Sequence, residues 1–379
     1  MSIKTLSKKM LAIVAAGAMT MGLAMPTLVF AAEGDTPSEV KEAYISKTFN
    51  TAVGKNETFS FQAKQVTGDT AEVTIPDINF TDSETGSKTK RAEVKFPNWT
   101  DAGKYEYTVT ETKAAPEITD GEHQKMIMSH AEYTMDVYVS NGDKGLEISN
   151  IIVNKKKDDE GKTAPDTTGK VDFSNTDKNT FNFTNTYVQE AGTGTDPISP
   201  DPTYKTDGSL NVTKAINTNG GTLDKDKEFA FTAKFTFPTG TDADTLGGVK
   251  DANGNKITIN EGGTYTFKLK ANGNMKFTGV PVGTIINVAE SATPNYRGSA
   301  ESVFNGQTQT RVSASKYNEA ITVKNTLGQK QNKVDVTNTY NYVPTTGIIM
   351  NNLPYVLMIA LCGAALMAFV AFKRRSLQK

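Results

Sequence analysis

Three short apolar segments occur in the same order in both halves of the chain, and each carries one polar residue on its apolar side. The segments are Ala43–Phe49, Tyr105–Glu111 and Phe181–Tyr187 in the first half, and Leu210–Ile216, Ile286–Glu290 and Val334–Tyr340 in the second. The polar residues are, in the same order, Lys47, Glu111, Asn185, Lys214, Glu290 and Asn338. A repeat of this kind predicts two similar domains.

Alternation of apolar and polar residues predicts that these six polar side chains face a core. Successive residues of a strand point to opposite faces, so residues i, i+2 and i+4 share one side. Lys47 therefore shares its side with Ile45 and Phe49, and Lys214 shares its side with Val212. Lysine and glutamate are rarely fully buried unless they are paired. The sequence thus predicts a buried Lys–Glu–Asn group in each half.

Short runs of alternating apolar and polar residues, such as Thr264–Leu269, are separated by clusters of Gly, Asn and Asp. This pattern of short strands and turns predicts an all-β fold. We expect two tandem β-sandwich domains over 32–188 and 207–342. Residues 189–206 lack periodicity and begin with a stretch rich in Gly, Pro and Thr, so they are expected to be a linker.

Burial would change the chemistry of each group. Desolvation lowers the pKa of a lysine amine and raises that of a glutamate carboxyl, so both can be neutral. A neutral amine is a nucleophile, and a protonated glutamate can donate to the asparagine oxygen and transfer protons. Lysine and asparagine held together could then form an amide and release ammonia. The alternative is a buried Lys–Glu salt bridge beside a hydrogen-bonded asparagine.

The N-terminal 31 residues have the composition of a secretory signal peptide. Lysines precede an apolar stretch from Met10 to Leu28, and Val29 and Ala31 are small residues before a cleavage site at Ala32. We therefore expect the chain to be secreted.

The C-terminal residues 343–379 combine a short motif, an apolar stretch and a basic end. The motif Val343-Pro-Thr-Thr-Gly347 precedes 20 mostly apolar residues, 353–372, and then Lys373-Arg-Arg375. Such an apolar length suits a transmembrane helix, and the basic residues suit its cytoplasmic end. A plain membrane anchor would explain the apolar stretch and the charges but not the motif.

Composition excludes several functions. The net charge of −1 gives no basic field for nucleic acid. The single cysteine, Cys362, lies in the apolar tail, so the chain has no disulfide to stabilise it outside the cell. With two histidines, no zinc ligand set is available, and Asp251–Asn255 lacks the later residues of a calcium loop. We expect no metal, no cofactor and no enzymatic activity on a substrate.

The two Lys–Glu–Asn sets resemble those of the isopeptide-forming, immunoglobulin-like (CnaB-type) domains of Gram-positive backbone pilins. The stretches Glu111-Thr-Lys-Ala-Ala-Pro116 and Glu290-Ser-Ala-Thr-Pro294 add to the resemblance. It implies Lys47–Asn185 and Lys214–Asn338 bonds, with Glu111 and Glu290 as the catalytic residues of each self-reaction.

The C-terminal tail resembles the sorting signal of Gram-positive surface proteins, which sortase cleaves between Thr and Gly. Here that bond joins Thr346 and Gly347, and Val343 replaces the usual leucine, which leaves the identity of the sortase open. The resemblance implies a major pilin of a pilus attached to the cell wall. Its expected partners are a pilin-type sortase, other copies of the chain, accessory pilins and peptidoglycan.

Polymerisation of such pilins requires a lysine that accepts the threonine of the next subunit. The Tyr-Pro-Lys motif common in pilins is absent. By resemblance to two-domain streptococcal pilins, the acceptor is Lys178, just before the last strand of the first domain. Strand parity also turns Lys178 outward if it already belongs to that strand. The rival lysines are in or near a charged stretch expected to form a loop: Lys155, Lys156, Lys157 and Lys170. A monomeric wall-anchored adhesin or minor pilin is the alternative function.

Overall fold

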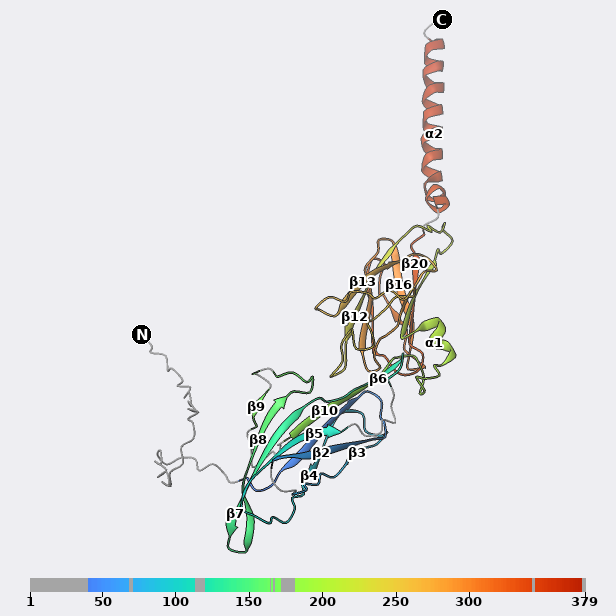
Figure 1. Ribbon diagram of the computed structural model, residues 1–379. Helices are drawn as coiled ribbons and strands as arrows, with labels where there is room; N and C mark the ends of the chain where they lie inside the picture. Colours follow the sequence, from blue (N-terminus) through green and yellow to red (C-terminus); the bar gives the residue numbers. More distant parts are fainter. Residues whose placement is uncertain are drawn as a thin grey trace, which may run out of the picture. The chain divides into compact units, whose positions relative to one another are not determined.

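The computed structural model describes residues 40–67, 71–112, 120–163, 165, 168–171, 181–342 and 345–376. All the described elements belong to one unit, Glu39–Lys379. Strands predominate in them, and the helices found there are α1 (Pro202–Asp207) and α2 (Thr345–Ser376) (Figure 1). The prediction of a β protein is confirmed in outline. The predicted signal peptide, residues 1–31, lies outside the described residues.

The described strands of the first half form two sheets. One has the order β4 (Gly86–Glu93), β1 (Tyr44–Thr51), β10 (Phe181–Gln189) and β6 (Gln124–Ile127). The other has the order β3 (Ile78–Phe80), β2 (Glu57–Thr67), β5 (Gly103–Thr112), β7 (Glu132–Gly142), β8 (Gly145–Lys157) and β9 (Gly169–Lys170). In the first of these sheets, β1 and β10 are parallel neighbours although they lie at opposite ends of the half.

The second half also contains two sheets. One has the order β14 (Asn274–Phe277), β11 (Leu210–Asn217), β20 (Lys333–Tyr340), β16 (Tyr296–Phe304) and β17 (Gln307–Thr308), with β18 (Val312–Ser313) also against β16. The other has the order β13 (Thr264–Leu269), β12 (Phe229–Thr236), β15 (Ile285–Glu290) and β19 (Ile321–Thr326). Here β11 and β20 are the parallel pair.

The two parallel pairs have the same register around the predicted lysines and asparagines. Phe49 of β1 is opposite Asn185 of β10, so Lys47 lies two residues before the partner of Asn185. Ile216 of β11 is opposite Asn338 of β20, so Lys214 lies two residues before the partner of Asn338. A two-residue offset keeps both side chains on one face of the sheet. The same diagonal arrangement therefore exists in both halves.

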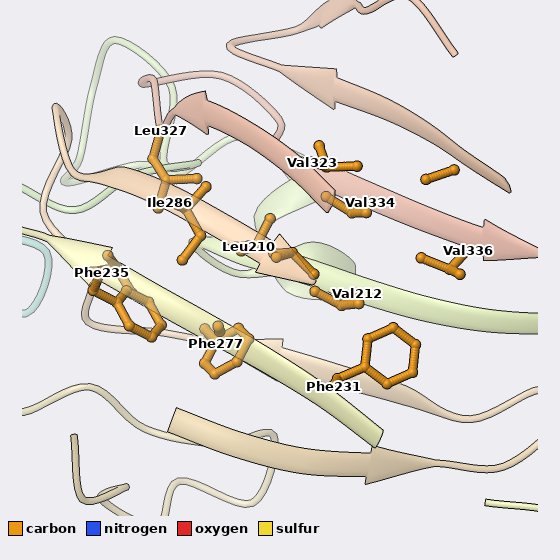
Figure 2. Close-up of a cluster of buried hydrophobic side chains, with 14 of the residues drawn as sticks. Leu210, Val212, Phe231, Phe235, Phe277, Ile286, Val323, Leu327, Val334 and Val336 are labelled. Atoms are coloured by element: carbon orange, nitrogen blue, oxygen red, sulfur yellow. The ribbon is translucent and has the colours of Figure 1, made fainter. Parts of the chain in front are cut away.

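Each half has its own cluster of buried apolar side chains. In the first half, the rings of Phe49, Phe59 and Phe80 contact one another edge to face. Figure 2 shows the labelled core of the second half, to which strands from both sheets contribute: Leu210, Val212, Phe231, Phe235, Phe277, Ile286, Val323, Leu327, Val334 and Val336. These clusters are the apolar surroundings into which the lysines and glutamates extend.

Residues 189–206, expected to be a linker, are partly buried. Gln189 ends β10, and Glu190, Ala191 and Thr193 are buried. The Gln189 amide donates to Thr193 Oγ1 and to the Gly194 carbonyl, so polar groups in the segment satisfy one another. Helix α1 then begins at a proline, whose fixed φ suits the first helical turn. Polar and glycine-rich composition conceals burial of this kind, and the domain boundaries stay predictions.

The predicted sortase cleavage site, Thr346–Gly347, lies in the first turn of α2. Pro354 lies further along the same helix. None of the helices in the described part of the chain is long and apolar enough to cross a membrane. The membrane-spanning tail expected from the sequence is therefore not shown.

The core of the first half generates a stability prediction. Phe183 is fully buried, with its ring 5.3 Å from those of Phe61 and Tyr133. We expect Phe183→Ala to lower the free energy of unfolding by about 3–5 kcal/mol, because it leaves a cavity. Guanidinium titration followed by fluorescence of Trp99, which packs against this core, measures the change. The control is Asn182→Ala, at the exposed neighbouring position; equal effects of the two substitutions would contradict the prediction.

Candidate functional site

The first cluster consists of Lys47, Glu111 and Asn185, which the structure brings together. Lys47 and Asn185 come from the parallel strands β1 and β10, whereas Glu111 comes from β5 in the other sheet. The Lys47 Nζ atom lies 2.6 Å from Glu111 Oε2, and Asn185 Nδ2 lies 2.6 Å from Glu111 Oε1. The side chains of Lys47 and Glu111 are 0% exposed. A single carboxyl group thus contacts both the amine and the carboxamide without water access.

The second cluster consists of Lys214, Glu290 and Asn338 and has the same plan. Lys214 and Asn338 lie on β11 and β20, and Glu290 ends β15 in the other sheet. Lys214 Nζ lies 3.1 Å from Glu290 Oε1 and 3.3 Å from Oε2. Asn338 Nδ2 lies 2.5 Å from Glu290 Oε1. All three residues are buried.

An aromatic ring covers the amine in each cluster, and the sequence reasoning missed it. Lys47 Nζ lies 4.2 Å from the centroid of the Phe59 ring, and Lys214 Nζ lies 4.3 Å from that of Phe229. A ring face attracts a lysine ammonium but also excludes water from it. Both phenylalanines lie near the start of the strand that follows the lysine strand, on β2 and β12. Their shared place in the repeat is the signal that could have found them.

Burial shifts the pKa of each charged group toward its neutral form. Desolvation lowers the pKa of Lys47 to about 8 and that of Lys214 to about 8, against the partial opposition of Glu111 and Glu290. Burial also raises the pKa of Glu111 and of Glu290, although the nearby lysines act in the other direction. Neutral amine and neutral carboxylic acid are therefore more accessible here than at a surface.

The orientation of the asparagine differs from the expectation. The sequence predicts that the glutamate donates to the asparagine oxygen. In both clusters the asparagine nitrogen instead donates to the glutamate. In the first cluster the backbone N–H of Ser129 donates to Asn185 Oδ1 over 2.7 Å. An N–H can only donate, so this contact fixes which end of the carboxamide faces Glu111. The glutamate oxygen is consequently next to the nitrogen that would leave as ammonia.

The predicted acceptor, Lys178, lies outside the described residues. The rivals Lys155, Lys156 and Lys157 lie in strand β8, so the expected loop at these three positions was wrong. Lys170 lies in β9. Three consecutive lysines at the end of this long hairpin strand look like a loop in sequence, because they interrupt the alternation of apolar and polar residues.

The contacts in the two clusters suit two chemical descriptions. An ion pair between lysine and glutamate, with a hydrogen-bonded asparagine, needs only these distances. A reaction between amine and carboxamide needs in addition a neutral amine, a proton carrier that contacts both groups, and exclusion of water. Burial of both clusters excludes water, and the direction of the lysine pKa shifts favours the neutral amine that such a reaction needs.

Comparison with known proteins gives partial matches. Residues 208–340 match a family described as a domain of unknown function (DUF7601). No curated protein matches the sequence.

Similar solved structures include the T3.2 major pilin of Streptococcus pyogenes, at 20% identity over 80% of this chain and 99% of that one, with a TM-score of 0.31. Another major pilin of Streptococcus pyogenes matches at 19% identity, over 79% of this chain and 98% of that one, with a TM-score of 0.31. The pilus-presented adhesin Spy0125 (Cpa) matches at 11% identity, over 79% and 100%, with a TM-score of 0.26. The structural neighbours are pilus proteins. Similarity at this level does not identify a function, so the function is inferred from the two Lys–Glu–Asn clusters.

The lowered pKa of Lys47 generates a pH prediction for an Asn185→Ala chain, in which the amine has no carboxamide to attack. Between about pH 8 and 10.5 the unfolded chain binds a proton at Lys47 that the folded chain does not. The free energy of unfolding should therefore rise with pH across this window and fall as pH drops through it.

Denaturant titrations of the Asn185→Ala chain, followed by Trp99 fluorescence from pH 7 to about 10.5, measure this effect. The control is Asn185→Ala with Lys47→Met, which has no amine at that position. If the two chains show the same pH dependence, Lys47 does not have the lowered pKa.

Proposed function

We propose that each cluster forms a covalent Lys–Asn isopeptide bond, within two tandem immunoglobulin-like (CnaB-type) domains. The observation that carries this proposal is the recurrence of one geometry. In both halves a buried glutamate carboxyl contacts a lysine amine and an asparagine nitrogen. The lysine and the asparagine lie on the first and last strands of the half, which are parallel neighbours. A single buried ion pair has many structural explanations, whereas two copies with the same register favour a shared chemistry.

In the proposed reaction, the glutamate transfers protons between the two reacting groups. The neutral Lys47 amine attacks Cγ of Asn185, and its surplus proton passes to Glu111 Oε2. Glu111 Oε1 returns a proton to Asn185 Nδ2, the Cγ–Nδ2 bond breaks, and ammonia leaves. An amide joins Nζ to Cγ, and the carboxyl regains its initial state. Lys214, Glu290 and Asn338 react in the same way.

The position of the bonds suits a protein that bears tension. Because β1 and β10 are parallel, the start of β1 and the end of β10 lie at opposite ends of the pair. Pulling on the two ends of the first half therefore loads this pair of strands in shear. A Lys47–Asn185 bond would join these two strands directly. The force would then bypass the strands that lie between them in the sequence. A disulfide within the chain could not supply this link, because the one cysteine, Cys362, has no partner and lies beyond Thr346.

We further propose that the chain is the major subunit of a covalently polymerised pilus on a Gram-positive cell surface. After secretion, a pilin-type sortase cleaves between Thr346 and Gly347 and transfers the Thr346 acyl group to Lys178 of another copy. Accessory pilins and peptidoglycan are the remaining partners, the latter receiving the finished fibre. Support comes from the Val343–Gly347 motif, the apolar and basic tail, and the clusters that would stabilise each subunit under load.

A monomeric wall-anchored adhesin or minor pilin is the second candidate. The same cross-linked domains and sorting motif would serve it, and it would need no acceptor lysine. The two candidates therefore differ in Lys178.

Intact mass tests the isopeptide proposal. The measured mass of the purified mature chain should be about 34 Da below the mass calculated from its sequence, because two ammonia molecules leave. Glu111→Ala and Glu290→Ala should each restore about 17 Da, since each removes one proton carrier. Lys104→Ala, at an exposed lysine, is the control and should retain the full deficit. An unchanged wild-type mass would show that the clusters are ion pairs only.

Cell-wall extracts test polymerisation. Boiled in detergent, they should give a ladder of covalent multimers on a gel, and Lys178→Ala should abolish it. Lys155, Lys156, Lys157 and Lys170, each changed to Ala, are matched controls that should keep the ladder. A ladder that survives Lys178→Ala moves the acceptor to another lysine, and a wild type without a ladder favours the adhesin.

A further inference from the structure

The two clusters differ at the carbonyl oxygen of the asparagine. Asn185 Oδ1 accepts a hydrogen bond from the Ser129 backbone N–H over 2.7 Å. Asn338 Oδ1 is buried and, within the described part of the chain, has no hydrogen-bond partner. This oxygen is the atom on which negative charge develops when an amine attacks the carboxamide, so a donor to it would lower the barrier.

Local chain geometry explains the difference. Strand β6 pairs with β10 and ends at Ile127, so Ser129 lies beyond the ladder and its N–H is free to reach the Asn185 side chain. In the second half, β16 stays paired with β20 through the position of Asn338, opposite Gly298. An added Cβ at Gly298 would lie 3.1 Å from Asn338 Oδ1, so the backbone passes close to that oxygen.

A partly buried hydrogen-bond network holds the Ser129 backbone in place. The Ser129 hydroxyl donates to Asp159 Oδ1 over 2.5 Å, and the Thr184 N–H donates to the same oxygen over 2.9 Å. The His130 N–H donates to the Asp159 carbonyl. Asp159 therefore links the segment that carries the donor to the residue that precedes Asn185. The Ser129 N–H lies 2.7 Å from the ground-state carbonyl oxygen, which places a donor beside the atom that would become the oxyanion.

We propose that the Ser129 backbone N–H is the oxyanion donor of the first cluster, with Asp159 as its positioning residue, and that the Lys47–Asn185 bond consequently forms before the Lys214–Asn338 bond. The inference rests on the proposed isopeptide function. As Lys47 Nζ bonds to Asn185 Cγ, the carbonyl electron pair moves to Oδ1, where the Ser129 N–H stabilises it. The pair returns as Cγ–Nδ2 breaks, and ammonia leaves with the proton from Glu111.

The test follows both bonds in one folding reaction. The full chain, isolated in guanidinium chloride from inclusion bodies so that neither bond has formed, is diluted into buffer and quenched in acid at timed intervals. Proteolysis and mass spectrometry then quantify the Lys47–Asn185 and Lys214–Asn338 linked peptides. Trp99 fluorescence reports the folding of the first half independently, because Trp99 lies 4.5 Å from Tyr105 in that core. The second cluster is an internal control for every variant.

The decisive comparison is Ser129→Pro against Ser129→Ala. Both lose the hydroxyl, but only proline loses the N–H. We expect proline to slow the first bond on the order of a hundredfold relative to alanine, with the second bond unchanged. Ser129→Thr, which keeps hydroxyl and N–H, should restore the wild-type rate, and Asp159→Ala should slow the first bond with native Trp99 fluorescence. Equal rates for proline and alanine would overturn the proposal.

The wild type supplies a test that does not depend on proline being tolerated. Its Lys47–Asn185 peptide should accumulate first, and a second bond that forms as fast or faster contradicts the proposal. If the wild type gives no linked peptides at all, the proposed function itself fails. If both linked peptides form at rates that do not change with the Ser129 substitutions, only the assignment of Ser129 as the oxyanion donor fails.

Discussion

The structure depends on the placement of a lysine amine and a glutamate carboxyl in a water-free core between two sheets. Moving such ions out of water costs several kcal/mol each, which their attraction offsets only with good geometry. Here the lysine and asparagine are on adjacent parallel strands, the glutamate comes from the opposite sheet, and a phenylalanine covers the amine. The strand order, the register and the aromatic packing all serve to bring these groups together. Formation of a neutral amide would remove the buried charges and the cost of burying them.

A covalent link between the first and last strands also changes the unfolded state. Lys47 and Asn185 are 138 residues apart (185 minus 47). By the loop-closure estimate used for disulfides, a link across such a distance stabilises the fold by about 5 kcal/mol. That is a large share of the stability of an ordinary domain. The proposed link requires no oxidant, because forming an amide with loss of ammonia changes no oxidation state. With the proposed link, a chain that has no disulfide would gain a comparable constraint from its own core.

The six cluster residues could be predicted from sequence because a strand has a period of two, and alternation alone assigns Lys47 or Asn338 to the apolar side. The direction of the Asn185 carboxamide could not, because it depends on Ser129, which lies outside regular structure and far along the chain. Phe59 and Phe229 looked like ordinary core residues. The start of the expected linker, residues 189–194, looked exposed because its polar groups are buried against one another. Periodicity therefore predicted the reactants, and tertiary contacts determined the groups that orient them.

A crystal structure of the purified chain would reveal whether the two Lys–Asn bonds exist. We expect continuous electron density from Lys47 Nζ to Asn185 Cγ and from Lys214 Nζ to Asn338 Cγ. Each join should refine to a planar amide with a C–N length of about 1.33 Å and no density for Nδ2. Separate lysine and asparagine side chains, each hydrogen-bonded to the glutamate but not bonded to each other, would contradict this prediction.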